Sequence, residues 1–501
     1  MTTRTIPWIA AALVLIVHLI GNPHYGFFRD ELYFIICGFH PQFGYVDQPP
    51  LVPLLAAGSQ LFGHSLFLLR AVPAIFGAAG AYVTCLLVAE MGGGVFAQVL
   101  ASLVFLFSGV LMSFGMKVST DEVNLFTWPL LALLLARIAK SADARLWLAV
   151  GAIAGITVES KYSVLFLFVA LAIGLLLTPQ RRILWGRWFV AGVALAIAIV
   201  LPNLLWQAHY GFPMWELLRA GQDGKNLIAG PLLYIAQEIL ITGLFTFPVW
   251  VIGLIWLLRN GTLRFLGYAY AVLIVEMLLF HGKHYYPAAV YPILMAAGAV
   301  WIEAWTQRVR PVRIAVLAYT LALGPLFIPF ALPMLPEPLF IAYQSRLGNL
   351  LDVPKTALAT EHGRELSALP GDWADMHGWP EMAAQIQSVY EALPASDRAQ
   401  AVVVASNYGE AAAVGFFTPN VPVISAHNQY WLWGTRGYSG NVVIDVNGDC
   451  GAKEHLFRSA RRAATFRAPY TIGWETDVPI MVCRGINVPL ATLWPQLKKY
   501  E

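Results

Sequence analysis

The chain has 501 residues, of which 58% are hydrophobic and only 12% are charged, and its formal net charge is +3. Soluble domains carry about 25% charged residues, so this composition excludes an ordinary soluble protein and indicates an integral membrane protein. The four cysteines form no CxxC pair and therefore give no metal or redox motif. We find no internal repeat and no basic, aromatic-interleaved patch, so the sequence does not predict a nucleic-acid partner.

Apolar stretches of about 17–25 residues can cross a bilayer as helices, and the sequence contains about eleven of them. They cover residues 6–22, 66–90, 95–116, 121–139, 146–159, 161–178, 188–207, 231–258, 264–281, 284–305 and 313–333. The first resembles a signal peptide, but no small-residue cleavage site follows it, so we interpret it as a retained helix. The fold class predicted is therefore mainly α, with many membrane spans.

The distribution of Lys and Arg predicts the orientation of these helices, because basic residues gather in cytoplasmic loops. With the N-terminus in the cytoplasm, the two densest basic runs before residue 340 lie inside; these are RRILWGR (181–187) and QRVRPVR (307–313). The rim motifs that contain acids, lysines or histidines then all lie on the opposite, extracytoplasmic face.

The composition changes near residue 336, where polar and charged residues become frequent. Short β-type runs at 401–406, 421–426, 441–446 and 480–483 alternate with helical patterns at 380–393 and 454–465. We expect a membrane domain of residues 1–335, followed by an extracytoplasmic α/β domain of residues 336–501. Cys450 and Cys483 both lie in the second domain, so an oxidising compartment favours a disulfide between them; two buried free thiols are the alternative.

The segment from residue 28 to residue 53 concentrates three carboxylates, Asp30, Glu31 and Asp47, among aromatic residues. A carboxylate at this rim could act as a general base toward an incoming hydroxyl or amine, whereas a helix cap or a solvated rim is the alternative. Tyr45 and Asp47 precede a rigid Pro-Pro step, so Asp47 could orient a substrate hydroxyl or cap the next helix. We interpret this segment as a wall of an active site.

Two further motifs on the same rim carry charge. Asp121, in the run KVSTDE (117–122), is either part of a helix cap or a second acid that faces the same cavity. Lys161 stands between two apolar runs, where it is either a snorkelling anchor or a phosphate contact.

The last rim motifs are rich in aromatic residues. Lys283 and His284 belong to HGKHYYP (281–287), whose cationic groups suit a lipid-linked phosphate. His281 and His284 could instead bind a metal, although no third ligand lies nearby in the sequence. Trp206 ends a span and indicates an interfacial aromatic belt first and a lipid or sugar contact second.

In their order and common sidedness, these motifs resemble the bacterial branch of the protein O-mannosyltransferase-like family, which has the GT-C fold and includes aminoarabinose-transferase-like relatives. The resemblance covers roughly residues 1–335. It rests on Asp30-Glu31, the Tyr45–Leu51 run, Thr120-Asp121, Lys161, the Trp206–Pro213 run, and Lys283 followed by Tyr-Tyr-Pro. In the outer domain, NYGEA (407–411) and HNQYW (427–431) are similar to stretches of uncharacterised bacterial members.

The resemblance implies an inverting glycosyltransferase of the bacterial inner (plasma) membrane. Such an enzyme takes a sugar from a polyprenyl-phosphate donor and passes it to an extracytoplasmic acceptor, which is a lipid, a glycan or a protein. The catalytic residues implied are Asp30 as base, with Glu31 beside it, and Asp121 as a second acid. The residues implied to hold the donor phosphate are Lys161, Lys283 and His284, and those implied to contact substrate are Tyr45, Asp47 and Trp206.

Two reservations and two alternatives follow from the residues. Arg29 would weaken Asp30 as a base if the two side chains paired. A divalent cation could share the phosphate load, but the sequence contains no dedicated ligand set for one. A transporter or lipid flippase is the main alternative; the lack of a repeat and the gathering of charges on one rim favour an enzyme. A non-catalytic assembly or sensor protein is the third possibility.

Overall fold

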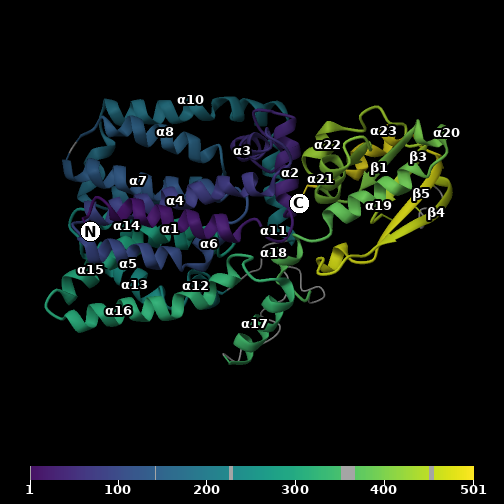
Figure 1. The fold of residues 1–501 in the computed structure, drawn as a ribbon. Helices are drawn as coiled ribbons and strands as arrows, with labels where there is room; N and C mark the ends of the chain where they lie inside the picture. The colour runs from purple at the N-terminus through teal and green to yellow at the C-terminus, as the bar shows by residue number, and fades with distance from the viewer. Residues whose placement is uncertain are drawn as a thin grey trace.

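The computed structural model describes residues 2–141, 143–224, 230–350, 367–448, 450 and 456–500. A bundle of long helices forms the first part of the chain, and a smaller α/β unit lies against one end of that bundle (Figure 1). The helices of the bundle are α1 (Ile6–Gly21), α4 (Leu66–Glu90), α5 (Val95–Leu106), α7 (Glu122–Ser141), α8 (Leu146–Val158), α9 (Val164–Leu176), α10 (Arg187–His209), α12 (Pro231–Thr242), α13 (Phe247–Arg259), α14 (Arg264–Leu279), α15 (Tyr291–Thr306) and α16 (Arg310–Leu323).

Each predicted span corresponds to one or more of these helices, but several spans are broken. Residues 95–116 form α5 and a separate short α6 (Gly109–Phe114), and residues 231–258 form α12 and α13, which meet at an angle of 115°. Within the described residues, five helical segments are long and apolar enough to span a bilayer, or six with the bent pair; four shorter helices are also apolar. The predicted count of about eleven is therefore not reproduced by length and composition alone.

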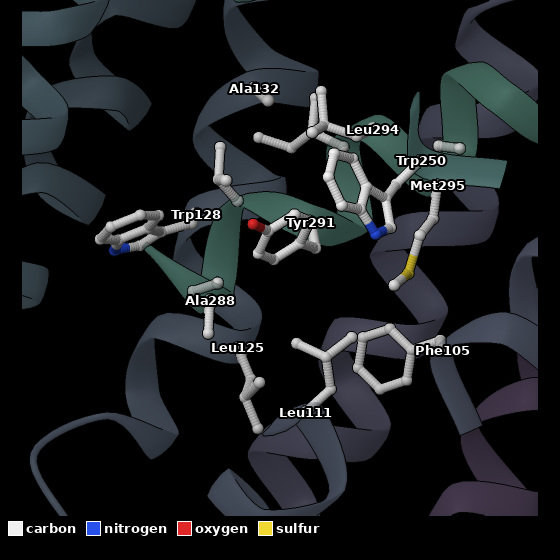
Figure 2. Packing of buried hydrophobic residues seen from close by; sticks show 14 of the residues in the cluster. Phe105, Leu111, Leu125, Trp128, Ala132, Trp250, Ala288, Tyr291, Leu294 and Met295 are labelled. Carbon is white, nitrogen blue, oxygen red and sulfur yellow. The ribbon is translucent and has the colours of Figure 1, made fainter. Parts of the chain in front are cut away.

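The core of the bundle is built from aromatic and aliphatic side chains of several helices. Figure 2 shows Tyr291 of α15 between Trp128 of α7 and Trp250 of α13, and the rings of Trp250 and Tyr291 lie 5.1 Å apart. Glycines allow α13 and α15 to approach each other closely: a Cβ atom at Gly253 would lie 1.8 Å from the Leu294 carbonyl oxygen. Such small-residue contacts are the usual means by which membrane helices pack.

Two short helices cross the end of the bundle, in the segment predicted only as an outer loop. These are α2 (Arg29–Phe39) and α3 (Leu51–Ser59). In Figure 1, α2 lies between the long helices and the α/β unit. A Cβ atom at Gly38 would lie 2.0 Å from the carbonyl oxygen of Pro53, so the two helices are in close backbone contact. The acids at the start of α2 are thereby fixed at the junction of the two parts.

The α/β unit contains one five-stranded sheet. Its strands are β1 (Ala401–Ala405), β2 (Val423–Ser425), β3 (Val442–Val446), β4 (Phe457–Phe466) and β5 (Val478–Ile486), in the order β2-β1-β3-β5-β4. β1 is parallel to β2 and β3, whereas β5 is antiparallel to both β3 and β4. The accompanying helices are α18 (Gly371–Ala374), α19 (Trp379–Glu391), α20 (Ala395–Arg398), α21 (Tyr408–Phe417), α22 (Gln429–Trp433) and α23 (Leu490–Leu493).

The prediction of a helix at 454–465 is wrong. Residues 454 and 455 lie outside the described residues, and from Phe457 the chain forms the edge strand β4, paired with β5 along its length. The arginines of β4 recur at intervals of three to four residues, as they would on the polar face of a helix. Hydrogen bonding to the largely buried strand β5 nevertheless keeps this segment extended. Elsewhere in this unit the structure contains a disulfide between Cys450 and Cys483.

The two parts of the chain share their hydrophobic cores. Tyr33 and Ile36 of α2 belong to the same buried cluster as Phe416 and the inward-facing residues of the sheet. In the other direction, Trp373 of α18 packs into the core of the helical bundle. Side chains from both sides of residue 335 therefore meet along α2 and α18, and the rim acids lie at this junction.

Candidate active site

Glu31 forms a buried ion pair. Its Oε2 accepts hydrogen bonds from Arg70 Nη2 at 2.9 Å and from the Phe28 backbone N–H at 2.8 Å. Its Oε1 accepts from Arg70 Nε at 3.0 Å and from the Val118 N–H at 3.1 Å. Both side chains are 0% exposed. Every carboxylate oxygen of Glu31 is therefore engaged and none reaches solvent, which favours a structural role; the catalytic role expected from the sequence stays a prediction.

Asp30, one residue earlier, has a different environment. About a third of its side chain is exposed, and its Oδ1 lies 3.7 Å from Arg29 Nε. The same oxygen accepts a hydrogen bond of 2.8 Å from the Tyr408 hydroxyl, which comes from α21 in the α/β unit. Adjacent positions on a helix point about 100° apart, so one acid of the pair faces the core and the other faces the rim.

Asp47 is held by both parts of the chain. Tyr33 donates its hydroxyl hydrogen to Oδ1 of Asp47 at 2.9 Å, and the Asn428 side-chain amide donates to Oδ2 at 3.2 Å. Burial raises the pKa of Asp47 to about 6. The side-chain oxygen of Gln429 also accepts a hydrogen bond from the Val46 N–H. The loop before α3 is therefore attached to the α/β unit.

Asp121 and Lys161, predicted for separate roles, are paired with each other. Lys161 Nζ lies 2.6 and 2.8 Å from the two carboxylate oxygens of Asp121, and both side chains are largely buried. The ammonium also lies 4.6 Å from the ring centre of Tyr286. Lys161 thus remains close to the aromatic residues that follow Lys283.

The HGKHYYP motif forms the other side of this cationic region. Lys283 Nζ lies 5.8 Å from the ring centre of Tyr285, and Lys161 lies 5.6 Å from the same ring. The ring of His284 contacts Tyr285 edge-on at 5.8 Å. The three predicted phosphate ligands therefore lie around one pair of tyrosines. Among the described residues, no three His, Cys, Asp or Glu side chains are grouped to hold a metal ion.

Four residues outside the predicted catalytic and binding set join the site. Arg29 pairs with Asp375 at 3.4 Å, and Lys117 pairs with Asp372 at 2.7 Å. Burial raises the pKa of Asp375 to about 7, and the charges of Asp30, Arg29, Lys117 and Asp372 all act on it. These groups therefore surround one point of the rim. Lys117 stands in a predicted rim motif, but Asp372 and Asp375 carried no signal in the sequence.

Two predicted substrate contacts, Tyr45 and Trp206, differ in their surroundings. Tyr45 is 0% exposed, and its hydroxyl donates to the Cys37 carbonyl oxygen at 2.8 Å, so in this structure it holds the loop in place. Trp206 donates from Nε1 to the side-chain oxygen of Gln42 at 2.9 Å. One edge of Trp206 lines an open apolar groove of about 490 Å³ on α10, together with Phe43 and Tyr210.

Together the fold and site define a polytopic helical protein with acids and lysines on one rim, and an α/β unit that completes that rim. Comparisons with known proteins show what this chain is similar to. A family model, dolichyl-phosphate-mannose-protein mannosyltransferase, matches residues 47–206. Lipid A galacturonosyltransferase RgtD of Rhizobium johnstonii is 27% identical over 186 residues, which cover 37% of this chain and 39% of that protein. The chain thus matches less than half the length of this curated relative.

Solved structures show a likeness along nearly the whole chain. ArnT from Cupriavidus metallidurans bound to undecaprenyl phosphate has a TM-score of 0.60 and 14% identity, over 95% of this chain and 97% of that chain. The apo state of the same protein gives a TM-score of 0.59 over 96% of this chain. The solved structures show that this chain shares the fold of ArnT, and the family model and RgtD support the resemblance to GT-C glycosyltransferases predicted from the motifs.

Proposed function

We propose that this protein is an inverting glycosyltransferase that moves a sugar from a polyprenyl-phosphate donor to an acceptor on the extracytoplasmic face. The observation that carries the proposal is the difference among the predicted catalytic acids. The side chain of Asp30 is 35% exposed, whereas those of Glu31 and Asp121 are 0% and 9% exposed and are paired with Arg70 and Lys161. Asp30 is the acid of this set that an acceptor can reach.

Direct displacement accounts for the arrangement of charge. Asp30 accepts the proton of the acceptor hydroxyl or amine while that atom bonds to the anomeric carbon. The bond from this carbon to the phosphate oxygen breaks, and the electron pair leaves with the polyprenyl phosphate. Lys161 and Lys283, with His284 beside them, stabilise the anion that leaves. Attack from the face opposite the phosphate inverts the anomeric centre.

The donor and acceptor classes rest on the relatives. ArnT is described as bound to undecaprenyl phosphate, and RgtD is described as a lipid A galacturonosyltransferase. The open groove beside Trp206 on α10 is lined mostly by apolar side chains and suits a lipid tail. We therefore propose a polyprenyl-phosphate sugar as donor and a membrane glycolipid as the acceptor to test first, with glycan and protein acceptors next.

The orientation of the chain is part of the proposal. The basic loops predict a cytoplasmic N-terminus in the bacterial inner membrane, which places α2 and the α/β unit outside. The disulfide between Cys450 and Cys483 supports an oxidising compartment for that unit. Labelling of single cysteines in intact cells by a membrane-impermeant reagent tests this: a cysteine at exposed Asp477 should react, and one at Arg182 should not.

The experiment for the function uses purified protein in nanodiscs with a panel of radiolabelled polyprenyl-phosphate sugars and a membrane lipid extract. We expect release of free polyprenyl phosphate, reduced at least about 100-fold in Asp30→Asn. Asp477→Asn removes a solvent-exposed acid of the outer unit and serves as the matched control with unchanged turnover.

Three outcomes would change the assignment. Normal turnover in Asp30→Asn would overturn its role as base. Binding of the lipids without turnover across the panel would favour a transporter or flippase. Because the proposal assigns the positive charge at the phosphate to lysines, EDTA should leave turnover intact; a loss that Mg²⁺ restores would bring a divalent cation into the site.

A further inference from the structure

Lys117 is a partly buried cation at the rim with an unusual partner. Its side chain is 11% exposed, and its Nζ lies 3.7 Å from the centre of the Phe28 ring. The aromatic face holds the ammonium in place at the start of α2. The carboxylate that neutralises it, Asp372 at 2.7 Å, comes from α18 in the outer unit and is 61% exposed.

Asp372 faces more than one positive charge. Contact with the bundle withdraws water from its carboxylate and raises its pKa, but the charges of Lys117, Arg29 and Lys283 outweigh this effect and lower it. Lys283 is one of the proposed phosphate ligands. The carboxylate of Asp372 is therefore influenced by several cationic side chains, and one of them, Lys283, belongs to the proposed donor-phosphate site.

A carboxylate and a phosphate are interchangeable partners for an ammonium group, and the phosphate is the stronger one because it carries more charge and more acceptor oxygens. We propose that Lys117 is a further ligand of the donor phosphate, and that Asp372 occupies this lysine until the donor displaces it. This inference rests on the proposed function and deepens it by adding one binding residue and one competing residue.

The surroundings allow this exchange without rearrangement of the fold. Trp373, which follows Asp372, is anchored in the core of the bundle, and Asp375 keeps its own pair with Arg29. Because most of the Asp372 side chain is exposed, it has room to turn away from Lys117 into solvent. Asp372, within α18, and Asp375, at its C-terminal end, thus have separate roles. Asp375 holds the α/β unit on α2, and Asp372 competes with the donor.

The test is direct binding of undecaprenyl phosphate to the full-length protein in nanodiscs, without turnover. Lys117→Gln should weaken binding about tenfold, which corresponds to the loss of about 1.4 kcal/mol. Asp372→Asn should have the opposite effect and tighten binding at least about threefold, because it removes the competitor but leaves the lysine. The double variant should bind as weakly as Lys117→Gln.

Two controls make the result specific. Undecaprenol, which lacks the phosphate, should bind all variants equally, and Asp477→Asn, an exposed acid paired with Arg467, should bind undecaprenyl phosphate like the unchanged protein. If the unchanged protein binds and Asp372→Asn binds no more tightly, the competition is refuted while the proposed function stands. If undecaprenyl phosphate binds no better than undecaprenol to the unchanged protein, the donor class itself fails.

Discussion

The buried pair of Glu31 and Arg70 allows a sharp prediction, because it separates two neighbouring acids by role. Arg70 donates to both oxygens of Glu31 and also to the backbone carbonyls of Asn22, His24 and Gly26. It therefore joins the end of α1, the start of α2 and the first turn of α4. Glu31→Gln preserves the shape of the side chain but leaves the Arg70 charge without compensation.

Removing one partner of a fully buried ion pair costs about 3–5 kcal/mol, because the remaining charge stays out of water. We expect Glu31→Gln to lose stability by this amount, measured as the unfolding midpoint by tryptophan fluorescence in detergent. Asp30→Asn is the matched control: that side chain is 35% exposed, so stability should change by no more than about 0.5 kcal/mol while transfer is lost.

A second comparison tests the cause. Glu31→Leu combined with Arg70→Met replaces both charges by apolar groups and should recover part of the stability that Glu31→Gln loses. A Glu31→Gln protein with an unchanged midpoint and no transfer would refute the reasoning, and would make Glu31 a catalytic residue after all.

Three further predictions follow from single contacts. Tyr408→Phe removes the hydroxyl that donates to Asp30 but keeps the ring packed against Tyr33, with the ring centres 4.6 Å apart. We expect kcat to fall about tenfold while KM for the donor stays unchanged. A tenfold change in KM as well would contradict a positioning role for Tyr408. Burial raises the pKa of Asp375 in the folded protein to about 7. Between its ordinary pKa of 3.8 and about 7, Asp375 therefore loses its proton in the unfolded chain but keeps it in the folded protein. Stability falls as the pH rises through this window. Unfolding midpoints measured from pH 4 to 7 should show this fall, and Asp375→Asn should flatten it in part, since Glu410 is shifted in the same direction. Replacing Cys450 and Cys483 by alanine opens a loop of 33 residues and should cost about 3–4 kcal/mol, measured with and without reductant; equal stability would argue against the bridge.

The elements of the fold were largely predictable because they depend on local pattern. Apolar runs of membrane length located the helices of the bundle, and β-branched runs located β1, β2, β3 and part of β5. The edge strand β4 was missed because its solvent-exposed arginines have no apolar alternation, and pairing with β5 alone holds it extended. The break within residues 95–116 was missed because a short gap between two apolar helices leaves the hydropathy continuous.

The sequence by itself indicated a membrane protein, a resemblance to GT-C glycosyltransferases and a set of rim residues, since apolar length, basic loops and motif order can all be read along the chain. Only the tertiary structure decided which of two adjacent acids is exposed, and that Asp121 and Lys161 neutralise each other. It also brought Tyr408 to Asp30 and Asp372 to Lys117 across more than 250 positions of sequence. An ionisable side chain is defined by its partners and its access to water, and both depend on residues that only the folded chain brings together.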